Sequence, residues 1–254
     1  MASLAKGLRV LAVCAEEGRD LRIVDIANTT GMPIPTVFRL LRTLEGEGYV
    51  EQLDTGRFRP GPAALGLGYQ LTRSHGLVVV ASEPLRRLAN SSGATVNLAV
   101  LTGINVLYLV RIRGDDLLMA NLDVGSQVPA ACTSLGKALL ANLDPAELKE
   151  RLRAVRLDAC QGPKALRTMA ELVAELDDVR ARGWALQDEE FAQGLRSLAA
   201  PIFDDKGILA AVNLVCQTSR YTREELVNQR LEPLLEVARD LSRRYGYADG
   251  PSSI

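Results

Sequence analysis

The sequence predicts an α+β protein, with an N-terminal winged helix-turn-helix, a linker helix, and an antiparallel sheet flanked by helices. Apolar residues recur at helical spacing in two short segments between residues 21 and 44, with a glycine between them. A hairpin pattern with a glycine in its turn follows over residues 49–59. From Thr95 the apolar period changes to that of strands. Strands and hairpins that alternate with helices are typical of an α+β domain.

The first two predicted helices lie before residue 30. Residues 3–15 form the first, with Ser3 as its cap. The side of this helix expected to face its neighbours carries Leu4, Leu8 and Leu11. The second helix covers Leu21–Asn28, and Gly31 then allows a sharp turn with positive φ.

The third helix has one apolar and one basic face. Pro33 and Pro35 mark its start, because proline is tolerated in a first helical turn. The buried stripe consists of Val37, Leu40, Leu41 and Leu44. The opposite face has no carboxylate before Glu45, as contact with phosphate requires. The candidate DNA-contacting residues on this helix are Pro35, Thr36, Arg39, Arg42 and Thr43.

A two-stranded wing follows this helix. Its turn reads Asp54-Thr55-Gly56, and strand alternation puts Arg57 and Arg59 on one face and Phe58 on the other. A basic helix suits the major groove of double-stranded DNA, and arginines suit phosphates or base edges, so Arg57 and Arg59 are further candidate contacts. The alternative is a winged helix that contacts only protein.

The charge balance implies more than one copy of this part on DNA. The chain has a net charge of −1, and residues 1–75 contain nine basic and eight acidic residues, a difference of one. A nearly neutral part that makes few phosphate contacts binds DNA weakly. We therefore expect a homodimer on a palindromic operator.

The composition points to a cytoplasmic protein. No apolar run approaches the ~20 residues that span a bilayer, and the first residues lack the pattern of a secretory signal. We expect no membrane partner, metal or cofactor. The cysteines match no metal-binding spacing and are expected to be reduced, mostly buried thiols: Cys14, Cys132, Cys160 and Cys216.

The remaining elements follow from period and capping signals. Pro60-Gly61-Pro62 ends the wing, and helices are predicted at 63–73 and 82–92. Strands are predicted at 95–101, 105–111, 117–122, 184–186, 198–202 and 208–215, and helices at 134–141, 145–153 and 168–182. A capping box from Thr222 opens a last helix that Pro233 should kink. The predicted domains are 1–62, a linker helix over 63–76, 77–247, and a frayed tail over 248–254.

Two motifs in this order resemble the IclR family of transcriptional regulators over nearly the whole chain. The first runs from Thr30-Gly31-Met32-Pro33 through Thr36–Leu44 to Gly48-Tyr49-Val50. The second comprises Ser134–Ala141, Asp188-Glu189-Glu190 and Gly194–Ile202. The resemblance implies a GAF-like effector-binding domain, dimers through the DNA-binding part, and dimers of dimers. Residues 124–134 further resemble the branch that controls protocatechuate, 4-hydroxybenzoate and β-ketoadipate catabolism.

The resemblance places an effector at the start of the predicted helix 134–141. Thr133 or Ser134 serves there either as a helix cap alone or also as a ligand-binding group. Free N–H groups and the positive end of a helix favour a carboxylate. Leu135 would cover an apolar part of the effector, whereas Lys137 is expected at the surface.

Further candidate effector contacts come from the strands. Ser197 stands where the family commonly has a cysteine that lines the pocket. Asp188 belongs to an acidic run whose neighbour lines the pocket in the family, and that neighbour is Gln187 here. Arg196 binds either a carboxylate effector or an acid of the protein. The remaining candidates, for which a core position is the alternative, are Leu117, Met119 and Asn213.

An enzyme is the alternative function. A small-molecule hydrolase on the second part would need a nucleophile and a base, but the single histidine, His75, falls in the linker. The sequence contains no Gly-x-Ser-x-Gly motif, phosphate loop or dinucleotide fingerprint. We therefore expect no catalytic residues and a regulator that responds to a small carboxylic acid.

Overall fold

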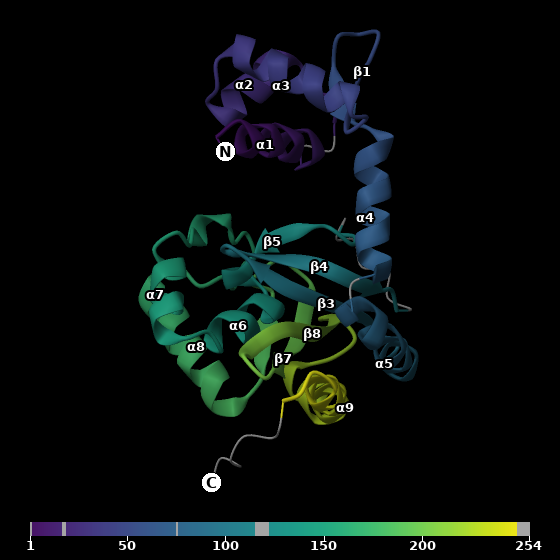
Figure 1. The fold of residues 1–254 in the computed structure, drawn as a ribbon. Helices are drawn as coiled ribbons and strands as arrows, with labels where there is room; N and C mark the ends of the chain where they lie inside the picture. The colour runs from purple at the N-terminus through teal and green to yellow at the C-terminus, as the bar shows by residue number, and fades with distance from the viewer. Residues whose placement is uncertain (1, 17–18, 75, 115–121, 248–254) are drawn as a thin grey trace. The chain divides into compact units, whose positions relative to one another are not determined.

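The computed structural model describes residues 2–16, 19–74, 76–114 and 122–247 (Figure 1). The chain divides into two compact units, Met1–His75 and Gly76–Ile254. No helix among the described residues has the length and apolar character needed to cross a membrane.

The first unit is a three-helix bundle with a wing and a following helix. Its elements are α1 (Ala2–Glu16), α2 (Ile23–Thr30), α3 (Ile34–Gly46), β1 (Val50–Gln52), β2 (Phe58–Pro60) and α4 (Pro62–Ser74). The apolar stripes of the helices and Phe58 of the wing meet in one small core. Gly31 ends α2 with φ 68°, as the sequence predicts.

The orientation of α1 differs from the prediction. Val10, Val13 and Cys14 are the buried residues of this helix, whereas Leu4 and Leu8 are exposed. The alternative stripe packs against α2 and α3, and it leaves an apolar surface on the opposite side. Helical spacing identified α1 but not which of its two apolar stripes faces the core.

The second unit contains a six-stranded antiparallel sheet in the order β5-β4-β3-β8-β7-β6. Its strands are β3 (Thr95–Thr102), β4 (Asn105–Ile112), β5 (Gln127–Pro129), β6 (Ala185–Asp188), β7 (Leu195–Asp204) and β8 (Gly207–Gln217). Its helices are α5 (Gly76–Ser92), η1 (Ala130–Cys132), α6 (Ser134–Ala141), α7 (Pro145–Leu152), η2 (Leu157–Ala159), α8 (Met169–Arg182) and α9 (Arg223–Arg244).

Helices cover both faces of this sheet (Figure 1). α5 and α9 pack on one face over a core of leucines and valines that includes Leu98, Leu198 and Leu214. α6 packs on the other face, with α8 outside it, over small residues such as Ala99, Ala199 and Ala211. These alanines let α6 approach the sheet closely, and α6 is buried along its whole length.

Three capping signals located helix starts, whereas Ser3, the cap predicted for the first helix, lies inside α1. Thr168 and Thr222 each form a capping box, with Glu171 and Glu225 respectively. Asp144 caps α7 as predicted. Other limits differ from the prediction: α5 begins at Gly76, β7 is longer, and β5 was not foreseen. Most of the strand expected at 117–122 lies outside the described residues.

The expectation of reduced cysteines is wrong for two of the four. Cys132 and Cys160 form a disulfide, with their Cα atoms 5.5 Å apart, although 28 positions separate them in the sequence. The chain returns to the start of α6 after α7 and η2, a proximity that no sequence spacing reveals. Cys14 and Cys216 are buried and form no disulfide, as expected.

Candidate functional site

The exposed face of α3 is the candidate DNA-reading surface of the first unit. Pro35, Arg39, Arg42 and Thr43 are exposed on it, and Thr36 is half-buried in its first turn. Val37 and Leu41 are fully buried on the opposite face. The five residues of α3 that are predicted to contact DNA therefore lie together on this face of the helix.

The four candidate arginines differ in how they are held. Arg42 pairs with Glu45 one turn away, at 2.7 Å, and Arg59 pairs across the wing with Glu51, at 2.9 Å. Arg57 donates to the carbonyl oxygen of Asp20 at 2.9 Å, which ties the wing to the segment before α2. Within the described part of the chain, no hydrogen bond or ion pair involves the Arg39 guanidinium.

The candidate effector site is a pocket between the start of α6 and the sheet. It encloses about 30 Å³, enough space for a water molecule, and opens to solvent, so a larger ligand requires the walls of the pocket to move apart. Its lining combines apolar and aromatic residues with amide, hydroxyl and guanidinium groups: Asn97, Tyr108, Arg111, Leu122, Thr133, Gln187, Phe191, Leu195, Ser197, Asn213 and Val215.

A row of polar side chains crosses three neighbouring strands beneath this pocket. Asn97 of β3 lies directly opposite Arg111 of β4 and Asn213 of β8 in the strand register. The Arg111 guanidinium donates to Asn97 Oδ1 at 3.1 Å, and Asn97 Nδ2 donates to Asn213 Oδ1 at 2.8 Å. The hydrogen bonds fix the three side chains in one line, buried at their centre.

The row of polar side chains continues onto α6 and onto the strands β7 and β6. Asn213 Nδ2 donates to Ser134 Oγ at 3.4 Å, and Ser134 and Ser197 share a hydrogen bond of 2.7 Å. The surrounding groups assign the Gln187 amide: its nitrogen donates to Ser197 Oγ at 3.1 Å, and its oxygen accepts from backbone N–H groups of residues 189–191. Gln187 thus links the pocket to the loop that follows β6.

Arg111 reaches the pocket because of a β-bulge. Val106 and Tyr108 face the α6 side of the sheet, whereas Val110 belongs to the core on the other face. The register shifts between Leu98 and Ala99, opposite this point in β4, and one extra residue reverses the alternation. Strict alternation from Tyr108 would have turned Arg111 away from the pocket.

Burial perturbs both ionisable groups of the pocket. Burial lowers the pKa of the Arg111 guanidinium, and it raises the pKa of Tyr108 to about 12. Arg111 Nε is buried and has no hydrogen-bond partner among the described residues. No acidic residue lines the pocket in the described part of the chain. The site therefore offers a partly unsatisfied cation and a neutral phenol.

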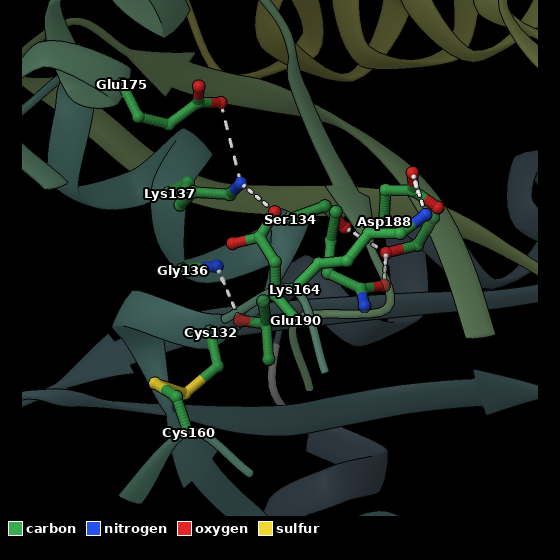
Figure 2. A network of polar contacts seen from close by, with 12 residues as sticks. Cys132, Ser134, Gly136, Lys137, Cys160, Lys164, Glu175, Asp188 and Glu190 are labelled. Atoms are coloured by element: carbon green, nitrogen blue, oxygen red, sulfur yellow. Dashed lines mark hydrogen bonds and ion pairs between the residues drawn. A yellow bond between two sulfur atoms is a disulfide. The ribbon is translucent and has the colours of Figure 1, made fainter. Parts of the chain in front are cut away.

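The loop over residues 189–194 forms one wall of the pocket through Phe191, and a buried ion pair holds it. Lys137 of α6 is 1% exposed and lies 2.7 Å from Glu190 and 3.4 Å from Glu175 of α8 (Figure 2). Burial raises the pKa of Glu190, and Lys137 offsets part of this effect. The expectation of a surface Lys137 is wrong, because the side chain spans the interior to reach these acids.

Some of the predicted effector contacts lie elsewhere. Asp188 and Arg196 point to the opposite face of the sheet from Gln187 and Ser197, where they pair at 2.6 Å. Lys164 also binds Asp188, at 3.0 Å (Figure 2). Leu135 is fully buried in the core beneath α6. Leu117 and Met119 lie outside the described residues.

The structure thus brings Thr133, Ser197 and Asn213 together as pocket-lining residues, with Ser134 directly behind them. The sequence reasoning missed Asn97, Tyr108, Arg111 and Phe191. The sequence did carry one signal for these pocket residues, namely a polar Asn97 and a charged Arg111 within two otherwise apolar strands.

Comparison with known proteins agrees with both units. The IclR helix-turn-helix domain model matches residues 3–54, and the bacterial transcriptional regulator IclR C-terminal model matches residues 69–243. The Pca regulon regulatory protein of Pseudomonas putida is 38% identical over 243 residues, which cover 95% of this chain and 83% of that protein.

Two solved structures share the fold. The IclR family transcriptional regulator from Brucella abortus superposes with a TM-score of 0.85 at 28% identity, covering 96% of this chain and 92% of that one. An IclR homolog from Microbacterium hydrocarbonoxydans, complexed with 4-hydroxybenzoate, superposes with a TM-score of 0.76 at 23% identity, covering 95% and 99%. The family models and these named relatives describe regulators of transcription rather than enzymes. The chain therefore belongs to the IclR family and is a DNA-binding transcriptional regulator with an effector-binding C-terminal domain.

Proposed function

We propose that the pocket beside α6 binds a small organic carboxylate and that its occupancy changes how the protein engages DNA. The observation that carries this proposal is the buried, unpartnered Nε of Arg111 in a pocket without acidic lining residues among those the structure describes. A buried donor that lacks an acceptor is costly, and a carboxylate supplies both the missing acceptor and the opposite charge.

The rest of the pocket suits such a ligand. Thr133 is the N-cap of α6, so the positive end of this helix lies at the pocket and favours an anion. Tyr108, with its raised pKa, stays protonated at neutral pH and can donate a hydrogen bond. Phe191, Leu195 and Val215 supply apolar surface for the body of the ligand.

An aromatic acid is the ligand that we favour. The 4-hydroxybenzoate bound by the Microbacterium homolog is an aromatic carboxylate, and the Pseudomonas relative is named for a regulon rather than for one ligand. Tyr108 and Phe191 provide aromatic partners for a ring.

Calorimetric titration with benzoate, 4-hydroxybenzoate and neutral benzamide tests the proposal. The acids should bind and the amide should not. Arg111→Met should weaken acid binding about tenfold to hundredfold, because a hydrogen bond to a charged group contributes roughly 1.5–3 kcal/mol. Arg87→Met on the distant helix α5, where Arg87 pairs with Glu83, is the matched control and should bind normally. Equal affinity for amide and acid, or an unaffected Arg111→Met variant, would refute the carboxylate assignment.

We further propose that the regulator works in the cytoplasm, where the DNA is, as a homodimer assembled through its first unit, or as a dimer of dimers. Leu4 and Leu65 are each 72% exposed, and Leu8 and Leu67 are also exposed. Apolar side chains grouped on short helices indicate surfaces that a second copy covers. The residues proposed to contact DNA remain those on α3 and the wing: Pro35, Thr36, Arg39, Arg42, Thr43, Arg57 and Arg59.

A further inference from the structure

The Cys132–Cys160 disulfide joins two segments that both support the pocket. We propose that this pair is a reversible thiol–disulfide site, oxidised when the pocket is in its high-affinity form and reduced when the pocket is loosened. The proposal rests on the proposed function of the pocket and adds a second input to it, the thiol–disulfide balance of the surroundings.

The Cys132 end of the bridge is fixed to the start of α6. Cys132 directly precedes Thr133, which lines the pocket and accepts a hydrogen bond of 3.0 Å from the Gly136 N–H. A Cβ atom at Gly136 would lie 2.1 Å from the carbonyl oxygen of Ala130. The short helix η1 therefore packs directly on the first turn of α6, without an intervening side chain.

The Cys160 end belongs to a segment that runs along the 189–194 loop. The Gly162 N–H donates to the carbonyl oxygen of Glu190 at 3.0 Å, and the Lys164 N–H donates to that of Glu189 at 3.3 Å. A Cβ atom at Gly162 would lie 2.1 Å from the Glu189 oxygen, so the two backbones are in direct contact. Lys164 adds ion pairs of 3.0 Å to Asp188 and Glu189.

These contacts connect into a closed circuit, of which Figure 2 shows the disulfide, the Lys137–Glu190 pair and the Lys164–Asp188 pair. The disulfide joins the start of α6 to the 160–164 segment, this segment holds the loop, and Glu190 returns to α6 through Lys137. Once the disulfide is open, hydrogen bonds and the half-exposed Lys164 ion pairs remain at the Cys160 end, and exposed ion pairs contribute little. The loop then has more freedom, and it carries Phe191 of the pocket wall.

The chemistry balances with a small disulfide R–S–S–R as the oxidant. One cysteine thiolate attacks a sulfur of R–S–S–R and breaks its S–S bond, which gives a mixed disulfide between the protein and R–S and releases R–S⁻. The second cysteine thiolate attacks the protein sulfur of this mixed disulfide, so that the Cys132–Cys160 bond forms and the second R–S⁻ leaves; each R–S⁻ takes up one proton. Each cysteine gives up one proton, and the two electrons reduce the oxidant. Both cysteines are buried, so exchange requires local opening of the segment.

The test begins with a thiol count on the full-length protein. After incubation with oxidised glutathione and then denaturation, we expect two reactive thiols per chain, those of Cys14 and Cys216, against four after reduction. Four thiols under both conditions would overturn the proposal. A Cys14→Ser variant, altered in the other unit, should still lose two thiols on oxidation.

Hydrogen exchange and calorimetry then test the coupling. Without any ligand, amides of residues 189–195 should exchange faster in reduced protein, and Cys160→Ser should exchange at the reduced rate in both buffers. Benzoate should bind about fivefold more tightly to the oxidised form, the low end of usual coupling between sites. Equal amide exchange rates in the reduced and oxidised protein, or equal benzoate affinity of the two forms, would overturn the proposed coupling between the disulfide and the pocket. If no carboxylate binds either form, the proposed function fails, and the thiol count and exchange alone decide this inference.

Discussion

Arg39 is the arginine on the α3 surface whose side chain has the fewest partners within the described part of the protein. Arg42 is held by Glu45 and Arg59 by Glu51, whereas no side-chain partner of Arg39 is found among the described residues. Arg39→Ala should therefore cost more operator affinity than Arg42→Ala, roughly 1–3 kcal/mol if the side chain reads a base edge. Fluorescence anisotropy with an operator duplex selected from a random pool measures this difference.

The salt dependence separates base reading from phosphate contact at the same residue. If Arg39 reads a base, its alanine variant loses discrimination between operator and random duplex. If it contacts only phosphate, all duplexes weaken equally and the salt slope falls by about one. If Arg39→Ala binds every duplex with the affinity of the wild type, the assignment of this face of α3 to the DNA interface is wrong. Arg87→Ala on α5 serves as the control for loss of a surface charge.

Glu190 should give the second unit a distinct pH dependence. Burial raises the pKa of this carboxyl above its ordinary 4.5, despite the nearby Lys137. The folded state then holds the proton more tightly than the unfolded state. Its contribution to stability is complete below pH 4.5 and is lost as the pH rises through the raised folded pKa. The wild-type advantage over Glu190→Gln should therefore decline with pH in that window and be constant above it.

Urea unfolding at a series of pH values measures this trend. Glu225→Gln is a control of opposite sign, because hydrogen bonds from the backbone N–H and the hydroxyl of Thr222 lower the Glu225 pKa. Its wild-type advantage should decline as the pH falls through the lowered value. A wild-type advantage over Glu190→Gln that grows with pH above 4.5 would contradict the assignment.

Residue types predicted part of the pocket, and local irregularity concealed the rest. Thr133, Ser197 and Asn213, which line the pocket, could be selected because the family resemblance and the start of a predicted helix pointed to them. Arg111 could not, because one bulged residue in β4 reverses which face it occupies. Nor could the Cys132–Cys160 contact be read from a spacing of 28 residues, since it depends on how α7 and η2 return the chain.

At the scale of elements, the close packing of η1 on α6 makes Gly136 a sensitive position. A Cβ there would lie 2.1 Å from the Ala130 oxygen, so Gly136→Ala should destabilise the second unit by about 1–3 kcal/mol or more. Gly66 of α4 is the matched control, because a Cβ at this position would meet nothing within 4 Å among the described residues. Gly66→Ala should be neutral or stabilising by roughly 0.5–1 kcal/mol. Thermal unfolding of both variants measures the contrast, and equal effects would show that η1 can move aside.

Elements with a chemical start or stop signal could be predicted closely, whereas those fixed by neighbours could not. Thr168, Thr222 and Gly183 marked helix ends that the structure confirms. The short strand β5 exists only because Gln127–Pro129 pair with the edge of β4. Likewise, α1 offers two apolar stripes, and contact with α2 and α3 decides which one is buried.

At the scale of the whole molecule, we expect the small net charge of the first unit to make assembly a condition for DNA binding. Nine basic and eight acidic residues in positions 1–75 leave an excess of one, and two of the candidate arginines already have acidic partners. In a dimer, the second copy doubles the contacts with DNA without a second bimolecular binding step. The dimer then gains affinity through avidity rather than through additional positive charge on each unit. Leu65→Glu on the exposed side of α4 should lower both the dimer fraction in light scattering and the operator affinity.

The operator itself should carry the symmetry of this dimer. Two first units related by a twofold axis read two inverted half-sites, about 10 base pairs or one helical turn apart, or a multiple of that distance. Inserting about 5 base pairs between the half-sites turns one site to the opposite side of the duplex, whereas about 10 restores the phase. We expect the half-turn insertion to weaken binding roughly a hundredfold or more and the full-turn insertion to weaken it less. If a single half-site binds as tightly as the intact operator, the protein reads DNA as a monomer, and the exposed leucines of α1 and α4 need another explanation.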